Sequence, residues 1–364
     1  MDESKITKRD YRIDLLKVIS IFSVVLIHVN STFVMNNEIM SKTWIYGVII
    51  RCMTLFCVCI FYMCSGILLY NRNKPYKMNY LFKTKVFKLI FVLIIWDFIY
   101  KNVDWYVNGA NINEYFGYLF EIFKMNNKYH LYYIYRAIPI FLYYPIGKQI
   151  LKSNNVTVYY LILMSIPVIF IRTLMFLPLT SHIEGNIYQI LANGAMEATY
   201  YSIFGYILYK NYDKNLKNNY DKIKAIKIYG ILSLITCIVL IMGLSTMKNE
   251  NDMNFVSACT IFGTMYTISI LIKGLSIDQI GEKWLKPIRI ISNNTLYIYV
   301  SHVLVLEQLE RMNWGDKFMD NTILKLIYPF ITTFLIIILV LFGIYVYKKI
   351  KIMLLRMLIQ VTPH

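Results

Sequence analysis

Long apolar stretches recur along the whole chain, and they constrain its fold more than any other feature of the sequence. An α-helix needs about 20 mostly apolar residues to cross the hydrocarbon core of a membrane. Ten stretches meet this need, roughly at residues 13–35, 44–70, 82–100, 131–151, 156–177, 187–209, 226–247, 255–273, 288–309 and 324–347. The sequence therefore predicts an all-α, polytopic membrane helix bundle with about ten transmembrane helices.

The composition excludes the main alternatives to such a bundle. The chain is 57% hydrophobic and 16% charged, whereas a soluble domain is about 45–50% apolar and about 25% charged. Because the apolar residues are spread over the whole length, a soluble enzyme with one hydrophobic anchor is excluded, as is a disordered or fibrous protein. We expect one integral membrane domain over residues 1–356 and a short C-terminal tail over residues 357–364.

The distribution of positive charge supplies an independent test of the topology. If the N-terminus is cytoplasmic, 26 of the 38 Lys and Arg residues fall in inner segments, 8 in outer segments and 4 inside helices. Cytoplasmic loops of membrane proteins carry such an excess. The pattern predicts cytoplasmic N- and C-termini, and it accounts for the net charge of +17 without nucleic acid. We expect a multi-pass protein of the cell membrane, and specifically of the cytoplasmic membrane of a bacterium.

The six cysteines do not form a recognisable metal or disulfide pattern. All of them lie within predicted helices, and no two have the Cys-x-x-Cys spacing. Structural zinc sites and disulfide frameworks show regular spacings of this kind. We therefore expect no metal, and we interpret these residues as small buried hydrophobes.

Ionisable residues inside the predicted helices are candidates for function, because charge is costly within the bilayer. The deep set consists of Asp14, Lys17, His28, Arg51, Asp97, Glu197 and His302. The alternative is that such groups are internal ion pairs or interface residues. For Asp97, Arg136 and Arg172 this alternative weighs at least as much as a functional role.

The first predicted helix has charge and imidazole on one face. Lys17 and His28 are eleven residues apart, so they differ by about 20° in direction and about 16 Å along the axis. Asp14 differs from His28 by about 40° and shares this face. Lys17 thus lies near the inner surface and His28 in the outer half. A buried histidine with satisfied hydrogen bonds remains an equal alternative for His28.

The ninth predicted helix carries a polar stripe that ends in a second histidine. Ser292, Thr295, Tyr299 and His302 fall within about 80° of one another on the helical wheel. Such a stripe faces a cavity or another helix. Because imidazole is the usual proton-transfer group near neutral pH, two deep histidines on polar faces favour catalysis. A third histidine, His130, begins the fourth predicted helix on its outer side.

Five motifs resemble those of a known family. They are Lys17-x10-His28 after Arg12-x-Asp14, Arg51 followed by Phe-Tyr-Met-Cys-Ser-Gly at 61–66, Lys85-x-x-Lys88, His-Leu-Tyr-Tyr at 130–133, and Ser-Asn-Asn-Thr-Leu-Tyr-Ile-Tyr-Val-Ser-His at 292–302. In this order the chain resembles the acyltransferase-3 family of integral membrane O-acyltransferases over nearly its whole length. The family has arginine where this chain has Lys17, Lys85 and Lys88. Lysine keeps the charge but loses the bidentate grip of a guanidinium group.

The resemblance implies an O-acetyltransferase that moves an acetyl or short acyl group from cytoplasmic acyl-CoA to a hydroxyl of a cell-surface glycan or its precursor. Acetyl-CoA or another acyl-CoA is then a donor substrate, with no permanently bound cofactor. The partners are this donor, a glycan or lipid-linked sugar acceptor and the lipid bilayer.

The resemblance also assigns roles to individual residues. His28 is expected to be a general base or an acyl carrier, and His302 to orient it or relay protons. The remaining site residues are expected to bind the donor (Arg12, Lys17, Lys85 and Lys88) and the acceptor (Arg51, His130, Glu197 and Tyr299). The basic residues at the inner mouth have a simpler alternative, which is that they serve membrane topology alone.

Two other functions fit an apolar bundle with a polar interior. One is a transporter or flippase for a glycan or a lipid-linked precursor, and the other is a membrane anchor or sensor for a partner protein. Turnover of an acyl-CoA thioester distinguishes the enzyme from both.

Overall fold

The computed structural model describes residues 9–72, 74–108, 117, 128–177, 194–319 and 321–361. Within these residues every regular element is a helix, and strands are absent from this part of the chain. The predicted all-α fold is therefore confirmed.

The helices follow one another with short connections. The first half contains α1 (Tyr11–Val29), α2 (Ser31–Met35), α3 (Lys42–Thr54), α4 (Cys57–Tyr70), α5 (Met78–Leu81), a π-turn (Phe82–Val86), α6 (Phe87–Asn108), a 3-10 turn (Tyr129–Leu131), α8 (Tyr132–Leu142), α9 (Tyr144–Ile150), α10 (Asn154–Ser165), a π-turn (Ile166–Ile171) and α11 (Arg172–Met175). The second half contains α13 (Gly194–Asn211), a π-turn (Tyr212–Leu216), α14 (Tyr220–Lys248), a 3-10 turn (Asn254–Val256), α15 (Ile261–Leu275), α16 (Glu282–Arg311), α17 (Asp316–Met319) and α18 (Thr322–Val361).

Six helical segments among the described residues are long and apolar enough to cross a membrane. They are Tyr11–Met35, Lys42–Tyr70, Asn154–Met175, Tyr220–Lys248, Asn254–Leu275 and Ile323–Met353. The other four predicted crossings correspond to α6, α8 with α9, α13 and α16, and they carry more polar residues. Residues 187–193 of the sixth predicted crossing lie outside the described residues. The count of ten crossings and the cytoplasmic location of the termini stay predictions.

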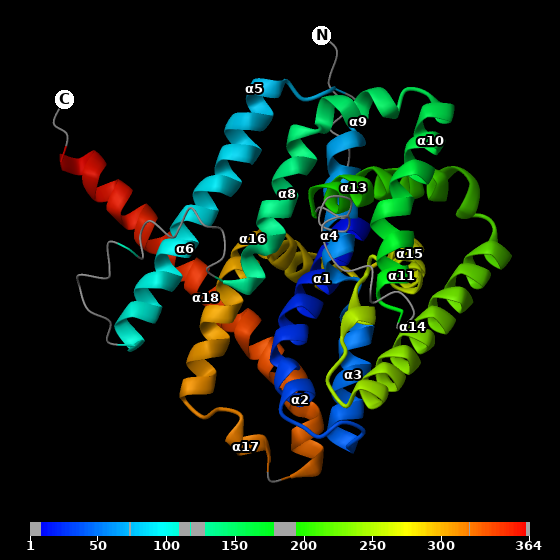
Figure 1. Cartoon of the computed structure of the whole chain (residues 1–364). Coiled ribbons are helices and arrows are strands. Elements are labelled where there is room, and N and C mark those ends of the chain that lie inside the picture. Colours follow the sequence, from blue (N-terminus) through cyan, green and yellow to red (C-terminus); the bar gives the residue numbers. More distant parts are fainter. Residues whose placement is uncertain are drawn as a thin grey trace.

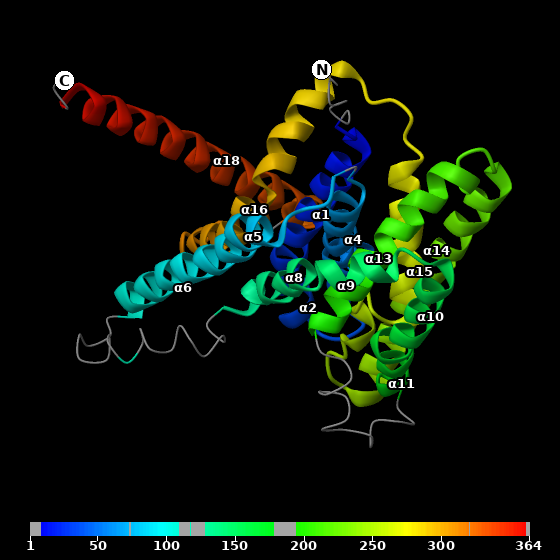
Figure 2. The same ribbon diagram turned by 90° about the horizontal axis from the view of Figure 1, so that it is seen from above.

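The bundle is arranged around α1. This helix contacts α3, α4, α15, α16 and α18. Viewed from above, α1 and α4 lie in the middle, with α6 and α18 on one side and α10, α14 and α15 on the other (Figure 2). In Figure 1, α5 and α9 lie at one end of the molecule and α2 and α17 at the other. The charge pattern assigned α5 and α9 to the inner membrane face and α2 and α17 to the outer face, and the two pairs lie at opposite ends of the molecule.

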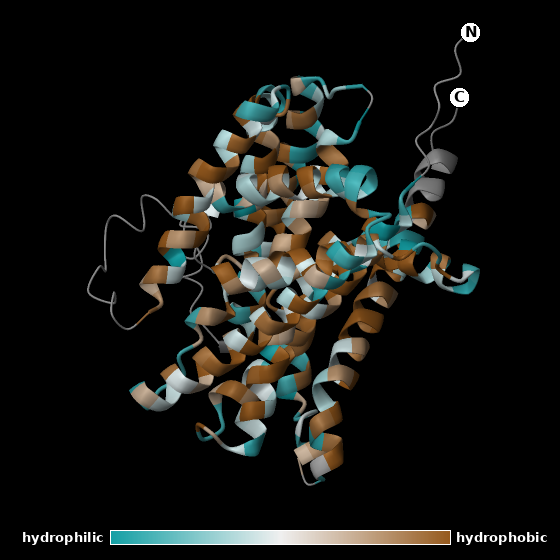
Figure 3. Cartoon of the chain, turned by 90° about the vertical axis from the view of Figure 1, so that its right-hand side faces the viewer, coloured by the Kyte–Doolittle hydropathy of each residue, from teal (hydrophilic) through white to brown (hydrophobic). Residues whose placement is uncertain are grey.

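Hydropathy along the bundle agrees with a membrane location. Hydrophobic residues cover the middle of the helices, and hydrophilic residues gather mostly toward their ends (Figure 3). Large apolar side chains also face outward, as at Phe91, Ile162, Val239 and Phe334, which are 58–64% exposed. In water such a surface would be unfavourable, whereas lipid tails solvate it.

Several predicted helices are interrupted in the structure, among them the stretch at residues 13–35, which breaks at Asn30 between α1 and α2. The stretch at residues 44–70 breaks at Leu55 and Phe56, and the stretch at 131–151 breaks at Tyr143, close to Pro139 and Pro145. The stretch at 255–273 starts as a 3-10 turn, and α15 begins at Ile261. Proline removes a backbone donor and disfavours a continuous helix. Irregular backbone at membrane depth is tolerated where protein or a cavity surrounds it.

Close packing of α4 against α13 depends on two glycines. A Cβ atom added to Gly66 would lie 1.8 Å from the backbone oxygen of Ser202, and one added to Gly205 would lie 2.4 Å from Cβ of Met63. Small residues let helix backbones approach closely within membranes. This contact explains the glycine that ends the second motif.

We expect Gly66→Ala to lower the thermal stability of the purified protein, because the new methyl group meets backbone that cannot move aside. Overpacking of this kind costs about 1–3 kcal/mol. Gly243→Ala on α14 is the matched control, since nothing lies within 4 Å of the added Cβ there. An equal melting temperature for the two variants would contradict the packing argument.

Candidate active site

Three histidines from distant parts of the chain form one cluster. The ring centroids of His28 and His302 are 5.1 Å apart, and those of His130 and His302 are 5.3 Å apart. His130 and His302 are fully buried, whereas His28 is partly exposed. The structure thus brings together His28 and His302, the two expected catalytic residues, and places His130 directly beside them.

Hydrogen bonds fix the orientation of His302. Its Nδ1 lies 2.6 Å from the backbone oxygen of Tyr299. Because a carbonyl can only accept, Nδ1 carries the proton and Nε2 is the unprotonated nitrogen. Nε2 is buried and has no hydrogen-bond partner among the described residues. The Tyr299 hydroxyl donates to the backbone oxygen of His130, which joins the two histidine segments.

Tyr100 supports the same region from α6. Its hydroxyl donates to the backbone oxygen of Val300 over 2.9 Å and accepts from the backbone N–H of Leu304 over 3.1 Å. Its ring lies 5.1 Å from that of His130. Sequence reasoning missed Tyr100, because the chain has 32 tyrosines and nothing in the pattern marks this one.

A cavity of about 490 Å³, named the outer cavity after the predicted topology, opens beside His28. Its charged lining consists of Arg51, Arg136, Arg172 and Glu197, and its tyrosines are Tyr129, Tyr132 and Tyr299. The break at Leu55 and the irregular residues 253–258 also line it. Two of the helix interruptions therefore shape this cavity.

Glu197 on α13 is the anchor of an ion-pair network in this cavity. Its Oε2 accepts from Nη1 of Arg136 at 3.0 Å and from Nη1 of Arg172 at 3.2 Å. Its Oε1 lies 2.5 Å from Sγ of Cys259. The ion-pair interpretation of Arg136 and Arg172 agrees with this geometry, and the expected role of Glu197 in acceptor binding stays a prediction.

Cys59, Glu197 and Cys259 also deserve consideration as metal ligands. One ligand atom from each lies within 4.8 Å of the others. However, two guanidinium groups already neutralise the carboxylate, and their positive charge opposes a cation at this position. The expectation of a metal-free protein stays a prediction.

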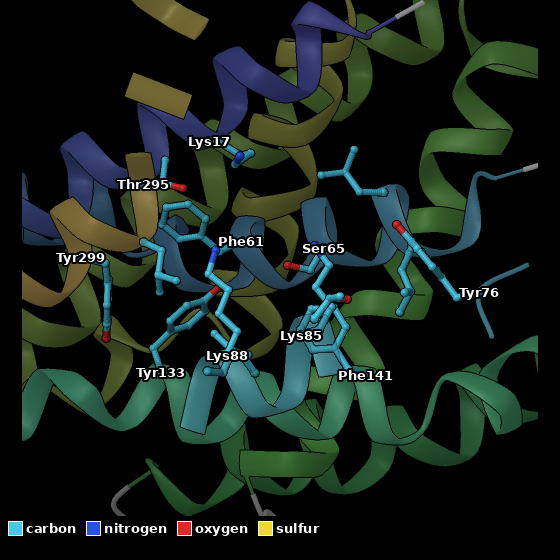
Figure 4. A pocket seen from close by; sticks show the side chains of 16 residues that line it. Lys17, Phe61, Ser65, Tyr76, Lys85, Lys88, Tyr133, Phe141, Thr295 and Tyr299 are labelled. Carbon is cyan, nitrogen blue, oxygen red and sulfur yellow. The ribbon is translucent and has the colours of Figure 1, made fainter. Parts of the chain in front are cut away.

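A second pocket of about 270 Å³, named the inner pocket after the predicted topology, contains three lysines. Lys17 comes from α1, Lys85 from the π-turn and Lys88 from α6. Lys17 lies across the pocket from Lys85 and Lys88, with Tyr299 at one end and Tyr76 at the other (Figure 4). The Lys17 ammonium donates to the backbone oxygen of Ser292 over 2.8 Å. Three expected donor-binding residues thus share one pocket.

Arg12, the fourth expected donor-binding residue, does not line this pocket. It pairs with Asp10 at 2.7 Å and with Asp213 at 3.1 Å. Burial raises the pKa of Asp10, but the hydrogen bonds and charge of Arg12 outweigh it, so this pKa lies below its ordinary value. Arg12 therefore ties the start of α1 to the π-turn after α13.

Asp14 is likewise engaged in fastening α1. It pairs with Arg9 at 2.5 Å and accepts from the Ser292 hydroxyl at 2.6 Å. Ser292 belongs to the polar stripe of α16, so part of that stripe serves helix contacts. Its deeper members, Tyr299 and His302, face the histidine cluster.

Tyr299 lines both the inner pocket and the outer cavity. The lysine-lined pocket and the cavity beside His28 therefore adjoin at one side chain.

Comparison with known proteins identifies the family to which the chain belongs. No curated protein and no solved structure matched the chain. The sequence profile of the acyltransferase-3 family, described as an acyltransferase domain, matches residues 10–349, so the chain belongs to this family of membrane acyltransferases.

Proposed function

We propose that the protein transfers an acetyl or other short acyl group from cytoplasmic acyl-CoA to a hydroxyl of a cell-surface glycan or its precursor. One observation carries this proposal. A pocket with three lysines and a cavity beside His28 share Tyr299 as a common wall. A donor and an acceptor held in these two spaces would meet at the histidine cluster.

The inner pocket suits an acyl-CoA donor. Lys17, Lys85 and Lys88 provide positive charge for phosphate groups, which lysine binds as a point charge. Phe61 and Leu89 add apolar lining for the pantetheine arm. Arg12 has no part in this proposed donor site, because it does not line the pocket and forms ion pairs with Asp10 and Asp213.

His28 is the group best placed to act as general base. Of the three clustered histidines it alone lines the outer cavity, and the other two are fully buried. Its unprotonated nitrogen takes the proton of the acceptor hydroxyl while the oxygen bonds to the thioester carbonyl carbon. The tetrahedral intermediate then breaks its C–S bond, and His28 returns the proton to the thiolate of CoA. The alternative role, acyl carrier, releases CoA before the acceptor reacts.

Thioester turnover tests the proposal against the flippase alternative. Purified protein in liposomes is expected to consume labelled acetyl-CoA in the presence of glycan acceptor. Mass spectrometry of surface glycans from cells with and without the gene is expected to show loss of an acyl group. Absence of turnover together with altered polymer export would favour the flippase.

We expect the double variant Lys85→Ala/Lys88→Ala to raise KM for acetyl-CoA about tenfold, which corresponds to about 1.4 kcal/mol. The physical reason is the loss of positive charge facing the nucleotide phosphates. S-acetylpantetheine lacks that nucleotide, so its KM is expected to stay constant. Lys83→Ala is the matched control, because Lys83 is exposed on the same π-turn and does not line the pocket. Equal changes of KM for both donors would contradict this assignment.

A further inference from the structure

We propose that the acyl acceptor is anionic and that Arg51 binds its carboxylate or phosphate group. This inference rests on the proposed function, in which the outer cavity holds the acceptor. It adds the chemical class of that acceptor and the residue that selects it.

The first observation is an excess of positive charge in the outer cavity. Among the described residues that line it, three are arginines and one is a carboxylate. That carboxylate, Glu197, accepts from both Arg136 and Arg172 through Oε2. The cavity lining that the structure describes thus carries more arginines than carboxylates, and its one carboxylate is engaged with Arg136 and Arg172 rather than with Arg51.

The second observation is that Arg51 lacks a counterion among the described residues. Its Nη1 makes one long contact of 3.5 Å to the backbone oxygen of Ile27. Its Nε is buried and has no hydrogen-bond partner in the part of the chain that the structure describes. A cation at membrane depth is costly unless it is paired. A negatively charged ligand in the cavity would supply the missing partner.

The third observation is the position of Arg51 relative to His28. Ile27 directly precedes His28, and Arg51 and His28 line the same cavity. The ring of Tyr129 lies 5.3 Å from that of His28, and Tyr132 lines the cavity nearby. A guanidinium group matches carboxylate and phosphate geometry through paired hydrogen bonds. A sugar whose anionic group is on Arg51 could therefore pack against a tyrosine and present a hydroxyl to His28.

Binding of three matched probes tests the inference. Isothermal titration of the purified protein would compare methyl glucuronide, glucose 6-phosphate and the neutral methyl glucoside. At least one anionic probe is expected to bind about tenfold more tightly than methyl glucoside, which corresponds to about 1.4 kcal/mol. Comparison of the two anionic probes identifies a carboxylate or a phosphate as the group recognised.

Two Arg51 variants and one control locate the preference. Arg51→Gln is expected to abolish the preference for the anionic probe over methyl glucoside. Arg51→Lys keeps the charge but loses the guanidinium fork, so its charged hydrogen bonds are weaker, and it is expected to reduce this preference about threefold. Arg311→Gln at the exposed end of α16 is expected to leave it unchanged. Size-exclusion profiles establish that each variant is folded, and Arg51→Lys carries the test if Arg51→Gln does not fold.

Failure of this inference is distinguishable from failure of the proposed function. Equal or undetectable binding of all three probes, or a preference that persists in Arg51→Gln, overturns the anionic acceptor. Acetyl-CoA turnover with no anion preference overturns it while leaving acyl transfer intact. An Arg51-dependent preference without any turnover supports the anion site and overturns acyl transfer.

Discussion

Replacing His28 with alanine is expected to lower the rate of acyl transfer about 100- to 10,000-fold, the usual contribution of a general base. The reason is geometric, because His28 is the clustered histidine that reaches the outer cavity. The measurement is kcat for purified enzyme in lipid nanodiscs with acetyl-CoA and the acceptor. KM for acetyl-CoA is expected to change little, since the lysines of the inner pocket remain.

The same experiment separates the two roles open to His28. An acyl carrier would release one equivalent of CoA per enzyme before any acceptor is added, whereas a general base gives no such burst. Ile19→Ala is a control on the same helix, at a side chain that is 37% exposed and outside both cavities. Acyl transfer at the wild-type rate in His28→Ala would show that this assignment is wrong.

Replacing Glu197 with alanine is expected to destabilise the fold by about 3–5 kcal/mol, the cost of removing one partner from a buried ion pair. The Arg172 side chain is 12% exposed and would lose its carboxylate, whereas that of Arg136 is 34% exposed and is partly screened by solvent. Denaturant or thermal unfolding of the purified protein measures the effect.

Two further variants test the cause of this destabilisation. Glu250→Ala is the matched control, because Glu250 is exposed in the turn after α14. Adding Arg172→Met to Glu197→Ala removes one of the two arginines that lose this carboxylate and is expected to restore part of the stability. An unchanged unfolding transition in Glu197→Ala would refute the role of this network.

The predicted crossings differ in how clearly hydropathy marks them. Apolar length alone identifies six candidate membrane-spanning segments among the described residues. The four other predicted crossings include the helices that carry Arg136, Glu197 and His302. Polar residues lower the mean hydropathy of these helices, so the alternation of Lys and Arg was a useful independent test of them. Part of the candidate site thus lies on the helices that hydropathy marks least clearly, while His28 and Arg51 lie on segments that it marks plainly.

Local periodicity predicted part of the site. The helical wheel put Lys17 and His28 on one face at different depths, and in the structure they line the inner pocket and the outer cavity, respectively. Contacts between distant segments could not be predicted in this way. Arg12 pairs with Asp213, 201 residues away, and the place of His130 beside His302 depends on how α16 meets the 3-10 turn. Both outcomes are set by tertiary packing.

The wall at Tyr299 has a consequence for the electrical insulation of the membrane. A bundle hollowed on both sides of one side chain replaces a barrier of full bilayer thickness, about 30 Å, by a much shorter one. The membrane potential is worth about 2.3 kcal/mol per elementary charge at 100 mV, and it falls mostly across the part that excludes water. With water in both spaces and the predicted topology, the field would be concentrated at Tyr299 and the neighbouring imidazoles, where a transferred proton would feel the voltage.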